Sequence, residues 1–393
     1  MELDLSLLLL TIMKNIISFL VLVLVSFLYS FNANATHIIG GEIGYTHVSG
    51  NTYEIKVTLY GDCAGSAFPS LPSAIPHIEI YKDNVGWSYI DLSLTGPGVE
   101  VTPVCPAEIN NTTCVNTSGT IPGVMRFIYA GFITLDGPAN EWSFVFNSLL
   151  GGNSAAGRTN AITNIYADTR MVLIATLNNM NGPNNSSIFT TIPTPFFCIN
   201  MAQEYNQGAA DADADQLSFS LVPGIAADNT GSIAGNVSYI PPYTYLNPLA
   251  VVPGSFIFNT TTGQMSFTAN MLQTSLVVNK VTEKRGGIVV GTAMREMNLV
   301  ILNNCNTQSP IASIPSSTVG AFDTSRTITL CNKVLNPQFV INASAPDTQN
   351  LSVTVTGLPL TANYNVIGNG TTNPVITINW IISQPVVPGT YNF

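Results

Sequence analysis

Charged side chains are scarce in this sequence. Only 9% of its 393 residues are Asp, Glu, Lys or Arg, whereas about a quarter of an ordinary globular protein is charged. The 12 basic residues are outnumbered by 22 acidic ones, which gives a net charge of −10. So few cations cannot neutralise a nucleic-acid backbone, and the composition excludes a nucleic-acid-binding protein. The hydrophobic share of 46% is nonetheless enough for each domain to form a core.

Histidine is also rare, with three residues in the whole chain. No Gly-x-Ser-x-Gly, His-Glu-x-x-His or glycine-rich phosphate loop occurs. His37 and His47 could form a metal site together with Glu42, but in a β-rich segment they fit better as ordinary strand side chains. These absences predict that the protein is not an enzyme.

Only one long hydrophobic run is present, and it lies near the N-terminus. Lys14 precedes an apolar stretch at residues 16–28, and a small-x-small cleavage motif ends at Ala35. The arrangement predicts a signal peptide over residues 1–35, with the natural start at Met13 because acidic residues precede it. A membrane anchor is the alternative, but the run is short for a span. We therefore expect a secreted protein without a transmembrane segment in the mature chain.

The cysteine count agrees with export. The six cysteines are Cys63, Cys105, Cys114, Cys198, Cys305 and Cys331. An even number in an exported chain predicts disulfides, and the absence of Cys-x-x-Cys disfavours a zinc site. Nearness in sequence favours a Cys105–Cys114 bond. The other four are then expected to pair as Cys63 with Cys198 and Cys305 with Cys331, although six cysteines allow many other patterns.

Apolar and polar residues alternate in many segments of the chain. The pattern is clear at residues 53–59, 217–221, 351–356 and 376–380. A period of two predicts strands with one buried face and one wet face. The 31 glycines and 24 prolines that interrupt these segments favour β-sandwiches, so we expect an all-β fold. The one helix candidate is the short segment 270–278.

Three aspartates, Asp211, Asp213 and Asp215, alternate just before a predicted strand. Carboxylate oxygens are hard ligands suited to calcium, and three of them so close would otherwise repel one another. An EF-hand is excluded because Gln216 stands where that loop needs glycine. The segment resembles the strand start of bacterial cadherin-like domains, with Ala214 in place of the usual glycine, and this resemblance implies calcium at the aspartates. A solvated acidic turn is the alternative.

Sequence patterns divide the mature chain into three expected domains. A β-rich domain covers residues 36–195, a cadherin-like β-sandwich covers 196–305, and an Ig-like domain covers 306–393. The last two share a pattern in which an acidic residue precedes an alternating strand, at Asp213 and again at Asp347. The chain stops within a segment typical of a strand interior, so we expect the third domain to be truncated.

The opening of the mature chain carries a second resemblance. It reads His-Ile-Ile-Gly-Gly-Glu at residues 37–42, and the next strand ends in Tyr-Gly-Asp-Cys at 60–63. Further blocks follow in order, at 158–164, 281–287 and 295–296. The series resembles the large adhesin-like surface proteins associated with gliding motility in bacteria. The resemblance covers nearly the whole mature chain and implies export by the type IX secretion machinery and a sorting domain beyond its C-terminal residue.

These features together predict a non-enzymatic, secreted cell-surface protein, the N-terminal part of an adhesin that contacts an extracellular surface or polysaccharide. Strand pairing and disulfides are expected to resist pulling, and calcium to stiffen a junction between domains.

The alternative is a secreted carbohydrate-binding or carbohydrate-active protein. Trp87 and Trp142 would then line a glycan face, although core positions fit them better. The spacing pairs none of the acids that cleavage would need: Glu42, Glu54, Asp62, Glu79 and Asp83. A plain structural spacer is a third hypothesis.

Overall fold

The structure is a computed structural model of the chain. It describes residues 38–382, with gaps at 66–67, 105, 149–156, 160, 167–169, 194–195, 228–231, 304–309, 318–320, 323–327, 330–335, 346–347, 356–357 and 360. Only the backbone is described at 106–107, 315–317, 321–322 and 328–329. The expected signal peptide at 1–35 and the C-terminal end lie outside the described residues.

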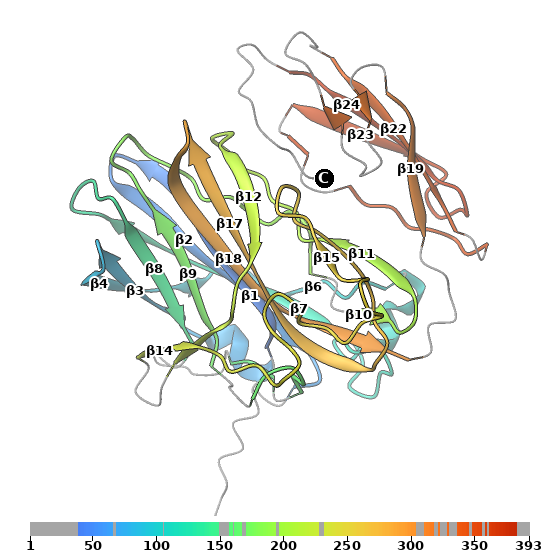
Figure 1. The fold of residues 1–393 in the computed structure, drawn as a ribbon, viewed down its shortest axis with the longest axis horizontal. Coiled ribbons are helices and arrows are strands. Elements are labelled where there is room, and N and C mark those ends of the chain that lie inside the picture. Colours follow the sequence, from blue (N-terminus) through green and yellow to red (C-terminus); the bar gives the residue numbers. More distant parts are fainter. Residues whose placement is uncertain are drawn as a thin grey trace, which may run out of the picture. The chain divides into compact units, whose positions relative to one another are not determined.

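Nearly all of the regular structure is β, which confirms the predicted all-β class (Figure 1). The largest sheet has 13 strands: β1 (Ile38–Ser49), β2 (Thr52–Asp62), β3 (His77–Lys82), β4 (Val85–Asp91), β5 (Ser93–Leu94), β6 (Val99–Glu100), β7 (Val124–Thr134), β8 (Trp142–Asn147), β9 (Val172–Leu177), β10 (Phe196–Cys198), β12 (Gln216–Leu221), β17 (Gln273–Arg285) and β18 (Ile288–Leu302).

Smaller sheets and two short 3-10 helices complete the described structure. The smaller sheets are built from β11 (Ala202–Asn206), β15 (Ile257–Phe258) and β16 (Gln264–Thr268); β13 (Ile225–Ala227) and β14 (Ile233–Asn236); β19 (Ile311–Ser317), β22 (Gln338–Ser344), β23 (Ala362–Ile367) and β24 (Val375–Trp380); and β20 (Ala321–Phe322) and β21 (Ile328–Thr329). The helices are η1 (Phe68–Ser73) and η2 (Pro106–Asn111).

The large sheet closes on itself through β4 and β5. Its hydrogen-bonded path runs β4-β3-β8-β9-β18-β1-β2-β7-β5. β4 and β5 lie at opposite ends of this path, yet only the fully buried Leu92 separates them in sequence. One extended segment therefore pairs with β3 and then with β7, and the layer curls around the main core. Gly131 of β7 permits the closure, since an added Cβ would lie 2.9 Å from Ile90 and 3.0 Å from Leu92.

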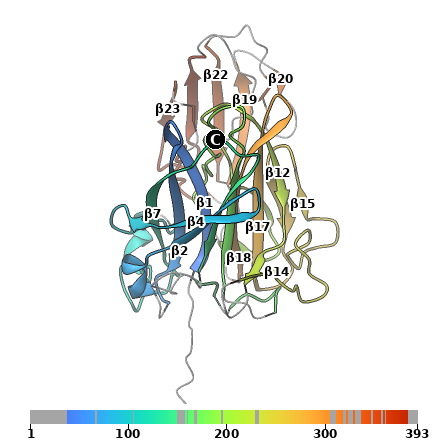
Figure 2. The same cartoon turned by 90° about the vertical axis from the view of Figure 1, so that its left-hand side faces the viewer.

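A long hairpin joins two segments that we expected to be separate domains. β17 and β18 pair with each other, and β18 lies between β9 and β1 (Figures 1 and 2). Within this arrangement Leu177 of β9 faces Gly291 of β18. The boundary expected at residue 195 therefore falls inside one sheet. Strand pairing joins the described residues from 38 to 302 into one β-structure, instead of two separate sandwiches.

The helix expected at residues 270–278 is wrong, because β17 begins at Gln273. Leu276 and Val278 pack in the main core, whereas Val277 packs in a second core on the opposite face of the strand. A strand buried on both faces carries consecutive apolar residues. The period of two that marks a half-exposed strand is therefore missing here, which explains the error.

A separate four-stranded sheet, in the order β19-β22-β24-β23, is formed by residues from 311 to 380. The strand predicted from the alternation around Ile376 and Ile378 is confirmed as β24, and both side chains are buried in the small core of this sheet. The alternation at 351–356 also predicted a strand. In its described part, however, Leu351 makes only an isolated bridge, so this prediction is wrong.

Candidate metal site

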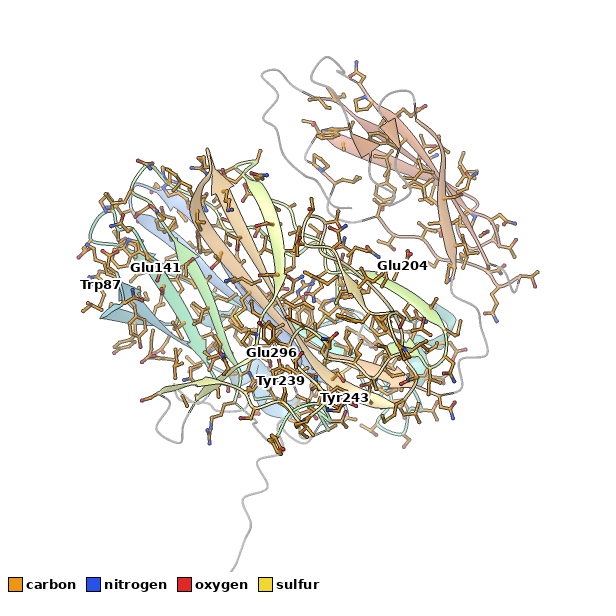
Figure 3. The ribbon with its side chains drawn as sticks, viewed as in Figure 1. Trp87, Glu141, Glu204, Tyr239, Tyr243 and Glu296 are labelled. Carbon is orange, nitrogen blue, oxygen red and sulfur yellow. A yellow bond between two sulfur atoms is a disulfide. The ribbon has the colours of Figure 1, made fainter. Side chains whose placement is uncertain are left out.

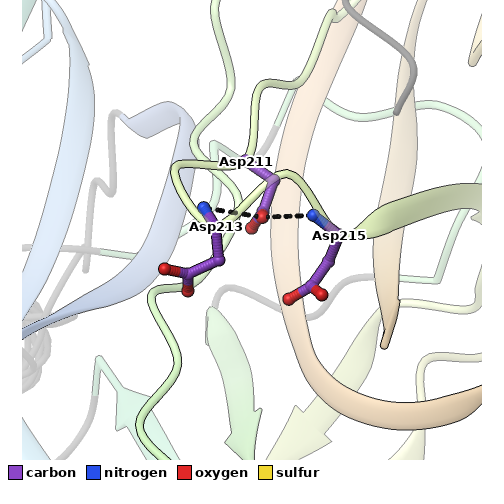
Figure 4. A group of neighbouring side chains, drawn as sticks. All are labelled: Asp211, Asp213 and Asp215. Carbon is purple, nitrogen blue, oxygen red and sulfur yellow. Dashed lines mark hydrogen bonds between the residues drawn. The ribbon is translucent and has the colours of Figure 1, made fainter. Parts of the chain in front are cut away.

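A tight turn before β12 gathers the three aspartates that the sequence singled out. Oδ1 of Asp211 accepts hydrogen bonds from the backbone N–H groups of Asp213 at 3.0 Å and Asp215 at 2.8 Å (Figure 4). Ala214 lies in the left-handed region, with φ at +60°. The turn thus forms with alanine where the resembling motif has glycine, although a left-handed non-glycine residue costs about 1 kcal/mol.

The three carboxylates lie close together. One oxygen of each lies within 4.8 Å of the others. Asp211 and Asp215 are buried, with 9% and 5% of their surface exposed, and Asp213 is partly exposed. Oxygen ligands grouped in this way are those that calcium and magnesium prefer. The buried triad could therefore bind a metal ion.

Arg285, at the end of β17, already brings one positive charge to the triad. Its Nε and Nη2 donate to the two carboxylate oxygens of Asp215 at 2.9 and 2.7 Å, a bidentate contact. Nη2 also lies 3.3 Å from Oδ2 of Asp213 and donates to the side-chain oxygen of Asn184. The turn is thus tied to β17 and to the loop that contains Asn184.

Glu283 adds a fourth carboxylate two residues before Arg285. It is fully buried and accepts hydrogen bonds from Nδ2 of Asn184 at 2.7 Å and from the N–H of Ser187. Burial raises the pKa of Glu283 to about 7, and the nearby charge of Asp211 adds to the rise. Burial likewise raises the pKa of Asp211 to about 6, with a further rise from the neighbouring aspartates. The three aspartates therefore share the Arg285 guanidinium, and Glu283 adds a further acid beside Asp211, which leaves more acids than cations in the cluster.

One oxygen in this cluster has no partner. Oδ2 of Asp211 is buried, and no donor in the described part of the chain reaches it. Leaving a buried polar atom unsatisfied costs about 1–3 kcal/mol, and more for a charged group. The oxygens of Asp213, in contrast, accept from the N–H and Nδ2 of Asn185 at 2.7 and 2.9 Å. The unsatisfied oxygen of Asp211 is therefore the position at which a cation would contribute most.

The sequence predicted the aspartates but not their partners. Arg285 and Glu283 lie in the block at 281–287 that carried the resemblance, yet nothing in the sequence linked that block to the aspartates. Val281 and Glu283 share the buried face of β17. An acid on the apolar face of a strand is the one signal that could have shown the connection.

The disulfides differ from the expected pattern. Cys63 is bonded to Cys114, so the expected Cys105–Cys114 and Cys63–Cys198 pairs are wrong. The reason is a loop that folds back: the N–H of Cys63 donates to the carbonyl of Gly123, and Cys114 packs directly against that glycine. Cys198 is also disulfide-bonded. Three cysteines lie outside the described residues: Cys105, Cys305 and Cys331.

Other residues considered from the sequence are parts of the fold. Glu42 and His47 are an odd number of positions apart on β1, so they point to opposite faces and do not share a metal site; His37 lies outside the described residues. Trp142 is fully buried in the main core. Trp87 packs edge-on against it, with ring centres 5.0 Å apart. The core interpretation is confirmed for Trp142, whereas Trp87 is only partly buried and covers the edge of that core.

The blocks that carried the resemblance meet in two buried ion pairs on β18. Arg295 and Glu296 are neighbours, so they point to opposite faces (Glu296 is labelled in Figure 3). Nε of Arg295 donates to Glu42 at 2.6 Å, and Arg158 donates to Glu296 through Nε and Nη2 at 2.6 and 2.8 Å. Arg158, Arg295 and Glu296 are no more than 1% exposed, and Glu42 is 18% exposed. The pairs tie distant segments together, which gives these motif residues a structural role.

Comparison with known proteins adds little. No protein-family model matches the sequence, and no curated protein matches it. A solved structure of surface layer protein SbsC, domains 1–6, is similar at 10% identity with a TM-score of 0.14, over 89% of this chain and 52% of that one. The chain thus spans about half the length of that structure, and so low a TM-score carries no argument about fold or function.

No helix in the described ranges is long and apolar enough to cross a membrane.

Proposed function

We propose that this chain is the N-terminal part of a secreted, non-enzymatic cell-surface protein that serves attachment, of the adhesin type associated with gliding motility. The N-terminal apolar run with its cleavage motif supports export. The ordered series of blocks supports the type IX route, and on this proposal a sorting domain follows the C-terminal residue. The attachment target is an extracellular surface or polysaccharide.

The observation that carries this proposal is the disulfide between Cys63 and Cys114, together with the bonded state of Cys198. Disulfides persist in oxidising compartments and are rare in the cytosol. The Cys63–Cys114 bond fastens the end of β2 to the loop that precedes β7. A protein stapled in this way, with so few charges on its surface, suits the outside of the cell.

Surface labelling of intact cells tests the proposal. Cells that express the protein with its own leader are treated with a membrane-impermeant biotin reagent and, separately, with protease. We expect biotin on the protein, cleavage by the protease, and faster migration of the non-reduced protein than of the reduced protein on a gel. Protein that is protected in intact cells and carries only free thiols would contradict the proposal.

The chain path places the aspartate turn far from the point where the chain leaves the large sheet. β1 and β18 are antiparallel neighbours, and Nδ2 of Asn298 lies 3.5 Å from the carbonyl oxygen of Ile38. The chain therefore enters the sheet at Ile38 and leaves it at Leu302 from the same end. β18 has 15 residues, so its other end lies roughly 45–50 Å away. Arg285 and the aspartate turn lie at that far end.

For the aspartate turn we propose calcium as the ligand of Asp211, Asp213 and Asp215. The unpartnered oxygen of Asp211 and the excess of acids over cations support this assignment. A bound calcium ion would supply positive charge and fix the turn against β17. Calorimetric titration of the purified chain is expected to show binding that Asp213→Ala abolishes. Asp91→Ala is the control, because that exposed aspartate contacts only His77 in the described structure.

A further inference from the structure

An open groove of about 480 Å³ lies on the face of β3, β8 and β9 that is turned away from the main core. Tyr81 of β3 lies opposite Ser143 of β8, which lies opposite Thr176 of β9. Glu79 precedes Tyr81 by two residues and therefore shares its face. The β13–β14 hairpin adds a wall through Ile233. The volume lies in the range of small-molecule sites, roughly 300–1,000 Å³.

Two carboxylates are held in fixed positions in this groove. The hydroxyl of Tyr81 donates to Oε2 of Glu79 at 3.1 Å, and the hydroxyl of Ser143 donates to Oε1 of Glu141 at 3.1 Å. The backbone of Glu141, just before β8 (Figure 3), donates to Oδ1 of Asp83 at 3.1 Å and accepts from its N–H at 2.8 Å. The second oxygen of each glutamate accepts no hydrogen bond within the described ranges, so it is available to a ligand.

The described lining of the groove carries negative charge, because it includes Glu79 and Glu141 and no Lys, Arg or His. Arg170 reaches the adjoining β13–β14 hairpin, where it donates to the carbonyl of Ala227. Lys82 follows Tyr81 but points to the other face of β3, where its Nζ bonds Asp136 and lies 5.1 Å from the ring centre of Trp142. A phosphate, sulfate or uronate would meet like charges here. The groove therefore selects a ligand that offers hydrogen-bond donors and carries no anionic group.

We propose that this groove binds one or two rings of a neutral or amino sugar in a polysaccharide. The free oxygens of Glu79 and Glu141 accept hydrogen bonds from sugar hydroxyl or amino groups, and the hydroxyl oxygen of Ser143, whose hydrogen goes to Glu141, accepts a further one. Ile174 and Ile233 offer apolar surface to the C–H groups of the ring. A basic peptide side chain would pair with one carboxylate and leave this hydroxyl and apolar surface uncovered. The inference rests on the proposed attachment function and names its target class.

Calorimetric titration of the purified full chain tests the proposal. The probes are neutral β-glucan and mannan oligosaccharides, chitosan oligosaccharides, alginate oligosaccharides as the anionic arm, and oligolysine as the peptide arm. We expect at least one neutral or amino sugar to bind and alginate not to bind. Glu79→Gln and Glu141→Gln should each weaken that binding roughly tenfold, because a charge-assisted hydrogen bond is lost.

The matched control is Glu204→Gln on β11, which Figure 3 shows well away from Glu141 and which should leave the affinity unchanged. Melting curves must show that each variant is folded. Absence of sugar binding by the wild type would overturn the proposal, as would binding that neither glutamate variant weakens. Tighter binding of oligolysine than of any sugar would overturn it as well. Surface labelling of cells is independent of these titrations, so labelled protein that binds no sugar would refute the groove and leave the attachment function standing.

Discussion

Raising the pH without divalent cations is expected to destabilise the aspartate turn. Burial raises the pKa of Asp211 from 3.8 to about 6 and that of Glu283 from 4.5 to about 7. A carboxyl group whose folded-state pKa lies above its unfolded value favours the folded state while it is protonated. This contribution is complete below about pH 4 and is lost as the pH rises through about 6 to 7.

The size of the effect follows from the shifts. Between pH 5 and pH 8, Asp211 with its folded pKa of about 6 loses ~1.4 kcal/mol of stabilisation, because its unfolded form is already ionised at pH 5. Glu283 with its pKa of about 7 loses up to ~2.5 kcal/mol over the same range. Glu283 acts in the same direction, but the two acids repel each other, so their contributions do not simply add. In a β-structure of this size 1 kcal/mol moves the melting temperature by about 2–4 °C. We therefore expect the protein in EDTA to melt roughly 6–10 °C lower at pH 8 than at pH 5.

Thermal melts followed by circular dichroism, in EDTA or in excess calcium, measure this effect. Calcium should restore the melting temperature at pH 8 and change little at pH 5, where Asp211 is protonated. Asp211→Asn keeps the acceptor for the two N–H groups and removes the charge. This variant should therefore melt higher than the wild type at pH 8 in EDTA and no longer respond to calcium.

Asp91→Asn is the control for charge removal and should respond to calcium as the wild type does. Two results would refute the reasoning about the aspartate turn. One is a wild-type melting temperature at pH 8 that is the same in EDTA and in calcium. The other is an Asp211→Asn variant that melts well below the wild type in EDTA, which would show that the carboxylate itself holds the turn together.

Three further predictions concern stability and are measured by urea unfolding. Cys114→Ala breaks the bond to Cys63 and should cost ~2–5 kcal/mol; a loss below 1 kcal/mol would contradict a structural disulfide. Glu296→Gln leaves the buried guanidinium of Arg158 without its charge partner and should cost ~3–5 kcal/mol, so an unchanged midpoint would be evidence against this pair. Gln207 is fully buried, and neither polar atom of its side chain has a partner among the described residues. Gln207→Met should leave stability equal or raise it by ~1 kcal/mol, and a clear loss would contradict this.

The sequence predicts those strands that have one wet face. Residues 53–57 alternate because Glu54 and Lys56 of β2 are the less buried members while Ile55 and Val57 enter the main core. The same rule fails at β17, where Leu276 and Val277 are buried on opposite faces and no alternation remains. Burial of both faces is a property of the tertiary structure, and the local pattern cannot show it.

The candidate site follows the same division between local and distant information. The aspartate turn is visible in the sequence because Asp211 bonds groups two and four residues away. Arg285 comes from a strand that is distant along the chain, and only the fold brings it to the turn. The disulfide prediction failed because it relied on nearness in sequence. Cys105 is near Cys114 in sequence, but the returning loop places Cys63 beside Cys114. Local chemistry is predictable from spacing, whereas partner choice depends on topology.

The two ends of β18 differ in what they would do in a surface protein. Ile38 and Leu302 lie at the same end of the antiparallel pair of β1 and β18. With residues 1–35 removed on export, Ile38 stands next to the free N-terminus, so load would reach this sheet only through the segment after Leu302. Such a load does not cross the strand pairs, so the expected resistance to pulling finds no support in this arrangement. The other end of β18 is different: Thr292 contacts Thr176 at the groove, and Arg285 lies just before the strand. Both candidate sites thus lie toward the end of β18 farthest from Leu302, where a module that binds a polysaccharide would present them.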